Sequence, residues 1–370
     1  MTARRTSRRL ADGREIIYFD ESPGAPERIA EDTRPLGERA ASGEIRHDAL
    51  TGDWVAVAAH RNERTFLPPK HECPLCPTGT GSVPSEVPEA AYDVVVFENR
   101  FPSYSPVSDH AAAGSAGDLV QSRPALGRCE VVCFTSDHES TFADLTPERT
   151  RTVIDAWADR TEELGAVPEI EQVFCFENRG QQIGVTLSHP HGQIYAYPYV
   201  PQRSAALLAQ ATAHHALTGR LLGADILAAE LAAEERVVID TDHWTAYVPF
   251  AARWPVEVHL APRRDVPDLP SLTDAERDDL ARVYLDLMQR LDRYYVAKEG
   301  SPIRLPYIAG WHQSPSRQGR DVSRLHLQVM SVLRSPKKLK YVAGSESGVG
   351  GWVNDVPPEQ IAARLRDVAS

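Results

Sequence analysis

The chain has 370 residues, of which 42% are hydrophobic and 25% are charged, as in an ordinary globular protein. The formal net charge of -12 and the pI near 5.6 argue against general nucleic-acid binding, and no apolar run approaches the roughly 18–20 residues of a membrane helix. The basic N-terminus lacks an apolar segment, so we expect no secretory signal. Five cysteines, an odd number in a long chain, favour a reducing cytoplasm.

The first half of the chain reads as strands, loops and one long helix. Residues 1–43 form a polar lead that contains one strand-like piece at residues 15–19. The helix is predicted to follow Thr146, a candidate N-cap, with Pro147 in the first helical position. Strands are predicted, from short apolar and β-branched runs, at residues 54–58, 92–101 and 128–136.

An internal repeat relates the two halves of the chain. The segment EVVCFTSDHESTFADLTPER, from Glu130, aligns at a constant offset with EVHLAPRRDVPDLPSLTDAER, from Glu257. Each segment leads into an amphipathic helix, a strand and a histidine-containing strand, which predicts a two-fold tandem α+β architecture. We therefore expect an N-terminal extension, an N-terminal half, an Ala/Leu-rich helical connector and a C-terminal half, at residues 1–43, 44–201, 202–235 and 236–370.

Cys73 and Cys76 form a CxxC pair in the Pro/Gly-rich loop 68–88. This spacing lets two thiolates reach one ion, so the pair is half of a tetrahedral zinc site. The remaining ligands must be histidine or carboxylate, because no second CxxC exists; a redox or incidental CxxC is the alternative. The other cysteines lie in apolar strand patterns and are expected to be small buried hydrophobes.

The stretch SHPHGQ, residues 188–193, carries the features of a nucleophile site. A neutral imidazole is a competent nucleophile at pH 7, and attack on phosphorus gives a labile phosphoramidate. Gly192 would let the backbone approach a phosphate, and Gln193 could donate to a phosphoryl oxygen without supplying a proton. The alternative is that His189 and His191 are both metal ligands or have no special role.

Polar residues recur at the predicted strand ends. The motif FENR occurs at residues 97–100 and again at 176–179. Its asparagines could contact a base or ribose, and arginines could pair with phosphate. Each could equally be a solvated turn residue, although their recurrence favours a binding role. The candidates are Arg61, Arg64, Asn99, Asn178, Gly184 and Thr186.

With these motifs assembled, the chain resembles the galactose-1-phosphate uridylyltransferases of the histidine-triad superfamily. The resemblance runs from about Arg46 to the C-terminus and rests on HPHGQIYA, supported by CPLCP, FENRG, AGWHQSP and KYVAGSE. No close resemblance accounts for residues 1–43. The resemblance implies an α+β fold of two tandem histidine-triad-like repeats, with a mostly antiparallel sheet that forms a half-barrel and helices packed on it.

The resemblance also implies an activity and roles for the residues. His191 would attack the α-phosphorus of UDP-glucose and release glucose 1-phosphate, and galactose 1-phosphate would then accept the uridylyl group to give UDP-galactose. Gln193 would steady the phosphoryl oxygens in this ping-pong reaction. A structural zinc would be bound by Cys73, Cys76, His138 and His189.

Further contact positions follow from the same resemblance, which also implies a homodimer. Arg61, Arg64, Asn99, Asn178, Gly184 and Thr186 match nucleotide or phosphate contacts. A C-terminal set, which a partner subunit could supply, matches hexose or phosphate contacts: Lys340, Tyr341, Ala343, Gly344 and Glu346. Val185 stands where some members have a cysteine, and Asn354 is the substitute that we expect for a phosphate-contacting glutamine.

A second metal site of some family members is incomplete in this chain. That site uses one glutamate and three histidines, and His312 and His326 match two of these ligands. Gln328 and Leu207 stand at the other two positions, so we predict no second metal. Gln328 is also the second-half counterpart of His191, so the second half lacks a nucleophile.

Two other functions compete with the uridylyltransferase. One is a nucleoside-diphosphate-sugar or dinucleoside-polyphosphate phosphorylase of the same superfamily, and Lys340 and Glu346, as sugar contacts, favour the transferase over it. The other is a catalytically inactive, zinc-stabilised nucleotide-binding protein. The intact pair of His191 and Gln193 argues against that alternative.

Overall fold

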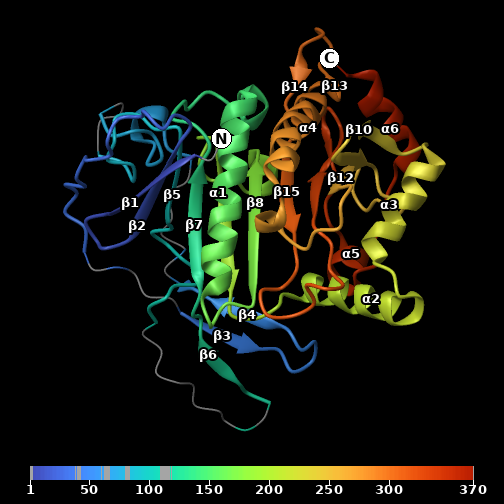
Figure 1. Ribbon diagram of the computed structural model, residues 1–370, viewed down its shortest axis with the longest axis horizontal. Coiled ribbons are helices and arrows are strands. Elements are labelled where there is room, and N and C mark those ends of the chain that lie inside the picture. Colours follow the sequence, from blue (N-terminus) through green and yellow to red (C-terminus); the bar gives the residue numbers. More distant parts are fainter. Residues whose placement is uncertain are drawn as a thin grey trace.

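The computed structural model describes residues 3–37, 39, 43–59, 61, 67–79, 84–108, 117 and 119–369. Its main feature is one eleven-stranded sheet in which every neighbouring pair is antiparallel (Figure 1). The strand order is β1 (Arg4–Arg9), β2 (Glu15–Asp20), β5 (Val94–Glu98), β7 (Arg128–Cys133), β9 (His191–Tyr197), β8 (Gln172–Arg179), β15 (Tyr307–His312), β16 (His326–Ser331), β12 (Val256–Pro262), β11 (Trp244–Tyr247) and β10 (Val237–Asp240).

Smaller elements surround this sheet. Three small sheets are formed by β4 (Trp54–Val57), β3 (Glu44–His47) and β6 (Ser122–Pro124), by β13 (Tyr295–Val296) and β14 (Pro302–Ile303), and by β17 (Leu333–Ser335) and β18 (Lys338–Leu339). The helices are α1 (Pro147–Ala166), α2 (Gln202–Thr218), α3 (Leu222–Ala233), α4 (Asp274–Arg293), α5 (Gly344–Val349) and α6 (Pro358–Asp367). No helix of the described residues is long and apolar enough to cross a membrane.

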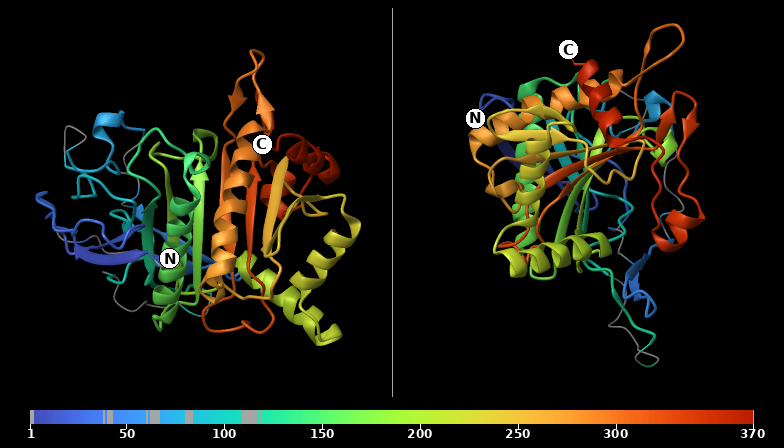
Figure 2. Two further views of the ribbon diagram at one scale, coloured as in Figure 1. Left: turned by 45° about the horizontal axis from the view of Figure 1, so that its top comes forward. Right: turned by 90° about the vertical axis from the view of Figure 1, so that its right-hand side faces the viewer.

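The two halves repeat one unit around the seam between β8 and β15. On either side of that seam lie β9 and β16, and beyond them β7 and β12. The helices α1 and α4 have 20 residues each and pack against one another on the same face of the sheet (Figures 1 and 2). Thr146 and Thr273 cap them by accepting hydrogen bonds from the backbone. The fold class predicted from the sequence is confirmed.

The sheet has one face beneath the helices and one face free of α1 and α4. Side chains alternate along β9, so that Ile194 and Ala196 are buried under the helices while His191 and Gln193 lie on the other face. The core between the sheet and the two helices is aromatic, with Trp157, Phe142, Tyr284, Trp311 and Trp244 all buried. This core fixes the strands that carry the predicted site residues.

The N-terminal residues are more structured than a polar lead. The hairpin of β1 and β2 extends the main sheet by pairing with β5. Its charged side chains are bound rather than solvated: Arg14 is 2% exposed, and its guanidinium donates to Glu86 at 2.6 Å and to the carbonyl of Glu98 at 2.7 Å. The many charged residues of this segment suggested a polar lead, whereas in the structure they form ion pairs within the fold.

Candidate active site

Four side chains form a cluster with the geometry of a metal centre. The ligand atoms of Cys73, Cys76, His138 and His189 all lie within 4.8 Å of one another. The Cys76 Sγ atom lies 3.3 Å from Nδ1 of His138 and 3.5 Å from Nδ1 of His189. Two thiols and two imidazoles are a donor set that suits tetrahedral zinc. The structure thus brings the CxxC pair together with both predicted histidine ligands.

Outer hydrogen bonds orient one of these ligands. His189 Nε2 lies 2.8 Å from the carbonyl oxygen of Thr135 and 3.0 Å from the hydroxyl of Tyr92. Because a carbonyl only accepts, Nε2 carries the proton and Nδ1 keeps its lone pair for a metal. Burial also lowers the pKa of His189 to about 4, which keeps the imidazole neutral, as a ligand must be. Sequence reasoning missed Tyr92, which no motif marks.

His191 begins β9, two residues after this cluster. Its Nδ1 atom donates a hydrogen bond to the carbonyl oxygen of His189 at 2.7 Å, so Nε2 carries the lone pair. Burial lowers the pKa of His191 below its usual value, and the imidazole is neutral at pH 7. An oriented, neutral imidazole with an available Nε2 has the properties that a nucleophile needs. Gln193 follows on the same face of the strand.

A cleft of about 270 Å³ opens beside His191. Its walls include Asn178, whose Oδ1 atom is buried and makes no hydrogen bond in the structure. Such an atom costs stability unless a ligand satisfies it, so Asn178 is a candidate binding residue. The sequence did not predict three other residues that line the cleft, Gln181, Gln182 and Arg304. The position of the two glutamines between FENRG and HPHGQ could have indicated them.

Packing requires a glycine at position 192, directly after His191. A Cβ atom there would lie 2.8 Å from the Phe134 ring and 2.9 Å from the carbonyl oxygen of Phe176. The sequence analysis assigned this glycine to close approach of a phosphate, whereas the structure shows a constraint from the helix-covered side. Gly184 differs, because it adopts a left-handed conformation with φ of 83° at the end of a short 3-10 helix.

Other predicted contact residues are spread around the cleft. The carbonyl of Thr186 accepts a hydrogen bond from the amide of Leu67, and Val185 lines the cleft. Arg61 donates to the carbonyl of Phe101 at 2.9 Å, and among the described residues it is not part of the cleft lining. Arg64 lies outside the residues that the structure describes.

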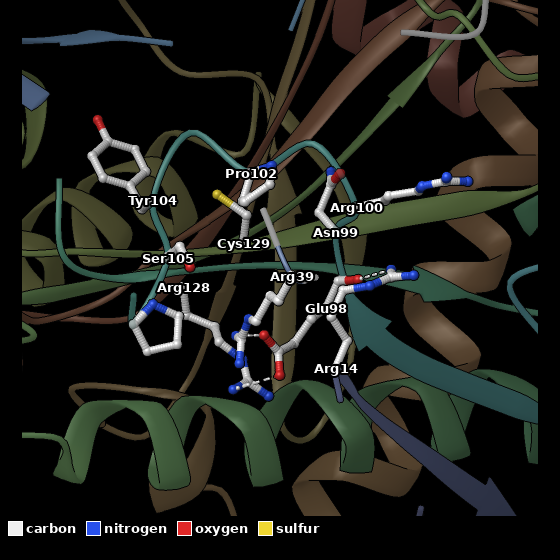
Figure 3. A pocket seen from close by; sticks show the side chains of 11 residues that line it. Arg14, Arg39, Glu98, Asn99, Arg100, Pro102, Tyr104, Ser105, Arg128 and Cys129 are labelled. Carbon is white, nitrogen blue, oxygen red and sulfur yellow. Dashed lines mark hydrogen bonds and ion pairs between the residues drawn. The ribbon is translucent and has the colours of Figure 1, made fainter. Parts of the chain in front are cut away.

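Asn99 lies in a separate, water-sized pocket. Figure 3 shows Asn99 pointing away from the Glu98 carboxylate, which lies between the guanidinium groups of Arg39 and Arg128. The Asn99 Oδ1 atom accepts a hydrogen bond from the amide of Phe101 at 2.9 Å. This local bond stabilises the turn after β5, so within one chain Asn99 acts first on its own backbone.

The C-terminal contact residues do not line the His191 cleft of their own chain. Lys340 and Glu346 pair with each other at 2.9 Å, and the amide of Ala343 donates to Glu346 at 3.1 Å. Gly344 opens α5, and Tyr341 is 76% exposed. In this single chain the segment is therefore folded on itself.

The remaining predicted positions lie in the C-terminal half. Gln328 lies between His312 and Glu257: its Oε1 is 3.2 Å from His312 Nε2, and its Nε2 donates to Glu257 at 2.6 Å. Leu207 lies on α2, with His326 lining the same cleft. Asn354 donates both hydrogen bonds of its amide to backbone carbonyls of residues 252 and 254, so it fastens two segments of the chain.

Comparison with known proteins finds relatives over nearly the whole chain. Residues 35–201 match the family model of the galactose-1-phosphate uridyl transferase N-terminal domain, and residues 205–370 match that of the C-terminal domain. A galactose-1-phosphate uridylyltransferase of Streptomyces lividans is 46% identical, covering 99% of this chain and 98% of its own length. That match includes residues 1–43, which the sequence analysis left without a resemblance.

More distant relatives give the same result. A galactose-1-phosphate uridylyltransferase of Thermotoga maritima is 34% identical over 88% of this chain and 98% of its own length. A solved structure described as a uridylyltransferase superposes with a TM-score of 0.76 at 31% identity, covering 88% of this chain and 98% of that one. The chain therefore belongs to the galactose-1-phosphate uridylyltransferase family.

Proposed function

We propose that this protein transfers UMP from UDP-glucose to galactose 1-phosphate through a covalent uridylyl-histidine, giving UDP-galactose and glucose 1-phosphate. The observation that carries the proposal is the tautomer of His191. Its Nδ1 proton is held by the His189 carbonyl at 2.7 Å, which leaves Nε2 as the reactive atom. Membership of the family supports the choice of substrates.

The proposed reaction has two displacements at one phosphorus atom. Nε2 of His191 attacks the α-phosphorus of UDP-glucose, and the bond to the bridging oxygen breaks, so that glucose 1-phosphate leaves with that electron pair. As the phosphorus–nitrogen bond forms, positive charge develops on the imidazole, and the Nδ1 hydrogen bond to the His189 carbonyl stabilises it. A phosphate oxygen of galactose 1-phosphate then attacks the same phosphorus and releases His191.

Gln193 is proposed to donate an amide hydrogen bond to the non-bridging oxygens in both steps. A carboxamide is not an acid at neutral pH, so it stabilises charge without protonating the leaving group. It also gives water no general base, which favours an intermediate that waits for a sugar phosphate. Asn178, with its unsatisfied Oδ1, is proposed as a nucleotide contact.

We assign zinc to Cys73, Cys76, His138 and His189 as a structural ion. Four protein ligands leave no position for substrate, so the ion supplies rigidity rather than chemistry. Held by such an ion, His189 would in turn keep in place the carbonyl that orients the imidazole of His191. The protein's own residues carry every step of the transfer.

We further propose that the enzyme is a cytoplasmic homodimer. The His191 cleft holds the nucleophile, but the Lys340–Glu346 segment lies elsewhere in the same chain. A second copy could bring Lys340, Tyr341, Ala343, Gly344 and Glu346 to the sugar phosphate. The five described cysteines are all free and buried, which fits a reducing compartment.

Mass spectrometry of the protein incubated with UDP-glucose alone tests the covalent step. We expect a uridylyl adduct on His191, no adduct in His191→Ala, and an unchanged adduct in His215→Ala, a change on α2 outside the cleft. Galactose 1-phosphate should discharge the adduct. Discharge by inorganic phosphate instead would identify a phosphorylase, and absence of any adduct would refute the nucleophile.

A further inference from the structure

A second cleft opens on the same sheet face, in the C-terminal half. Its volume is about 360 Å³, and its lining includes His259 of β12, His312 of β15 and His326 of β16, together with residues of α2 and α3. Among the described residues, none lines both this cleft and the His191 cleft. The second cleft is therefore separate from the proposed catalytic site, and we name it the histidine cleft.

The walls of the histidine cleft are mostly apolar. Leu208 and Ala211 of α2, Ile226 of α3, and Tyr247 and Phe250 of the sheet side contribute to them. Ile226 is 43% exposed and Phe250 is 74% exposed. Apolar surface gathered in a concave site of this size is typical of small-molecule binding, because a ligand removes it from water.

The floor of the histidine cleft offers hydrogen-bond acceptors. Glu257 accepts from the Gln328 amide nitrogen at 2.6 Å, so the Gln328 oxygen faces His312 Nε2 at 3.2 Å. His312 must then donate from Nε2, which leaves Nδ1 with a lone pair. In His326 the Nδ1 atom lies 3.4 Å from the carbonyl of Arg324 and must donate to it, which leaves Nε2 with a lone pair. These imidazoles are therefore suited to ligands with N–H or O–H groups.

Two imidazoles of the floor, those of His312 and His326, are uncharged. Burial lowers the pKa of His312 to about 3, with a further contribution from Arg203, and burial also lowers that of His326. Arg203 lies near the like charge of Arg253 and the opposite charge of the Glu257 carboxylate. Arg324 donates to the carbonyls of residues 223 and 263, and among its described neighbours it also pairs with Asp265. These two imidazoles therefore present neutral nitrogen atoms, rather than cations, to a ligand.

One buried atom of the floor lacks a partner. His259 Nε2 makes no hydrogen bond in the structure and lies 3.4 Å from the Glu257 carboxylate. The rings of His259 and His326 have centroids 5.2 Å apart, and those of His312 and His326 are 4.9 Å apart. A ligand that forms a hydrogen bond with His259 Nε2 would satisfy a polar atom that the described part of the chain leaves without one.

The repeat narrows the class of ligand. Around the seam between β8 and β15, the histidine cleft lies on β12, β15 and β16, which correspond to the strands β7, β8 and β9 that carry the nucleotide half of the chain. The second half lacks the HPHGQ phosphate segment, since Gln328 stands in the place of the nucleophile. A cleft of about 360 Å³ with apolar walls and without the HPHGQ phosphate contacts is suited to a nucleoside.

We propose that the histidine cleft binds an uncharged nucleoside, with its base between the apolar walls and its N–H and O–H groups donating to the imidazole nitrogens of the floor. This site is non-catalytic and is distinct from the UMP-transfer site. The choice of a nucleoside rests on the proposed function, because it comes from the correspondence with the half of the chain that carries His191.

Calorimetric titration with uridine, in the presence of saturating UMP to fill the His191 cleft, tests the proposal on the full-length protein. We expect one uridine per chain under these conditions. Ala211→Phe, which fills the cleft from α2, should weaken uridine binding by at least about tenfold. Ala213→Phe, an exposed change of equal size on the same helix, should leave it unchanged. Melting temperatures of both variants verify that they are folded.

A second measurement locates the bound molecule. In the NMR spectrum of protein with isotope-labelled histidine, uridine should shift the signals of His259, His312 and His326, and UMP should not shift them. Absence of uridine binding beside UMP would overturn the proposal, as would equal binding by Ala211→Phe. Stoichiometric metal bound at these imidazoles, with no response to uridine, would also overturn it and would identify the cleft as a metal site.

Discussion

Replacing Gly192 by alanine tests whether packing behind the sheet positions the nucleophile. The new Cβ atom would lie 2.8 Å from the Phe134 ring and 2.9 Å from the Phe176 carbonyl oxygen. To reach ordinary contact distances, each must lengthen by about 0.5 Å, and the carbonyl can do so only if β8 and β9 separate. Overpacking of this kind typically costs about 1–3 kcal/mol.

The same displacement should reach the chemistry, because His191 precedes Gly192 in β9. A misplacement of 1 Å can cost about 100-fold in rate, so a shift of half that size predicts a fall of about tenfold in kcat for UMP transfer. Denaturant unfolding and rapid-quench kinetics of His191 uridylylation measure the two effects. Gly37→Ala, with no atom within 4 Å of its Cβ, is the control. A Gly192→Ala enzyme with native stability and native kcat would refute the reasoning.

Three further predictions concern the surroundings of the site. Cys73→Ser should lower the zinc content and the melting temperature more than it lowers the rate per folded molecule; an unchanged melting temperature would show that the ion is not structural. Arg160→Met removes the guanidinium that pairs with Glu130, where both side chains are at most 1% exposed, and leaves Arg128 as the remaining partner of that carboxylate. The change should cost about 1.5–3 kcal/mol in denaturant unfolding, most of which adding Glu130→Leu should restore. Burial raises the pKa of Glu177 to about 7, so this carboxyl binds a proton more tightly in the folded protein than in the unfolded chain. The stability of the protein should therefore fall as pH rises from about 4.5 to about 7. Glu177→Gln should remove that part of the pH dependence, and an identical profile for the two proteins would contradict the assignment.

Local patterns predicted the parts of the fold that depend on neighbouring residues. The capping residues Thr146 and Thr273 marked the starts of α1 and α4, and the offset between the two segments revealed the repeat. The spacing of the CxxC pair alone predicted half of a metal site. Its histidine ligands came only from resemblance, because the approach of His138 to Cys76 depends on how distant loops pack and not on sequence spacing.

Features that depend on strand register could not be predicted from the sequence. His259 lies opposite Gln328 only because β12 and β16 pair in one register, so no motif could join it to His312 and His326. The N-terminal arginines resembled a solvated tail because their acidic partners are distant in the chain, as Arg14 and Glu86 show. Lys340 and Glu346 were predicted as ligand contacts, and their mutual ion pair is visible only in three dimensions.

The seam between β8 and β15 has a consequence for how the chain folds. Each strand is an interior strand of the sheet only because the other half of the chain is present, and the hydroxyl of Tyr307 donates across the seam to Glu177 at 2.9 Å. Separated after residue 201, each half would expose a long unpaired edge, which is a template for aggregation. Each half of the chain therefore covers the edge strand of the other half. We expect the chain to unfold in a single cooperative transition.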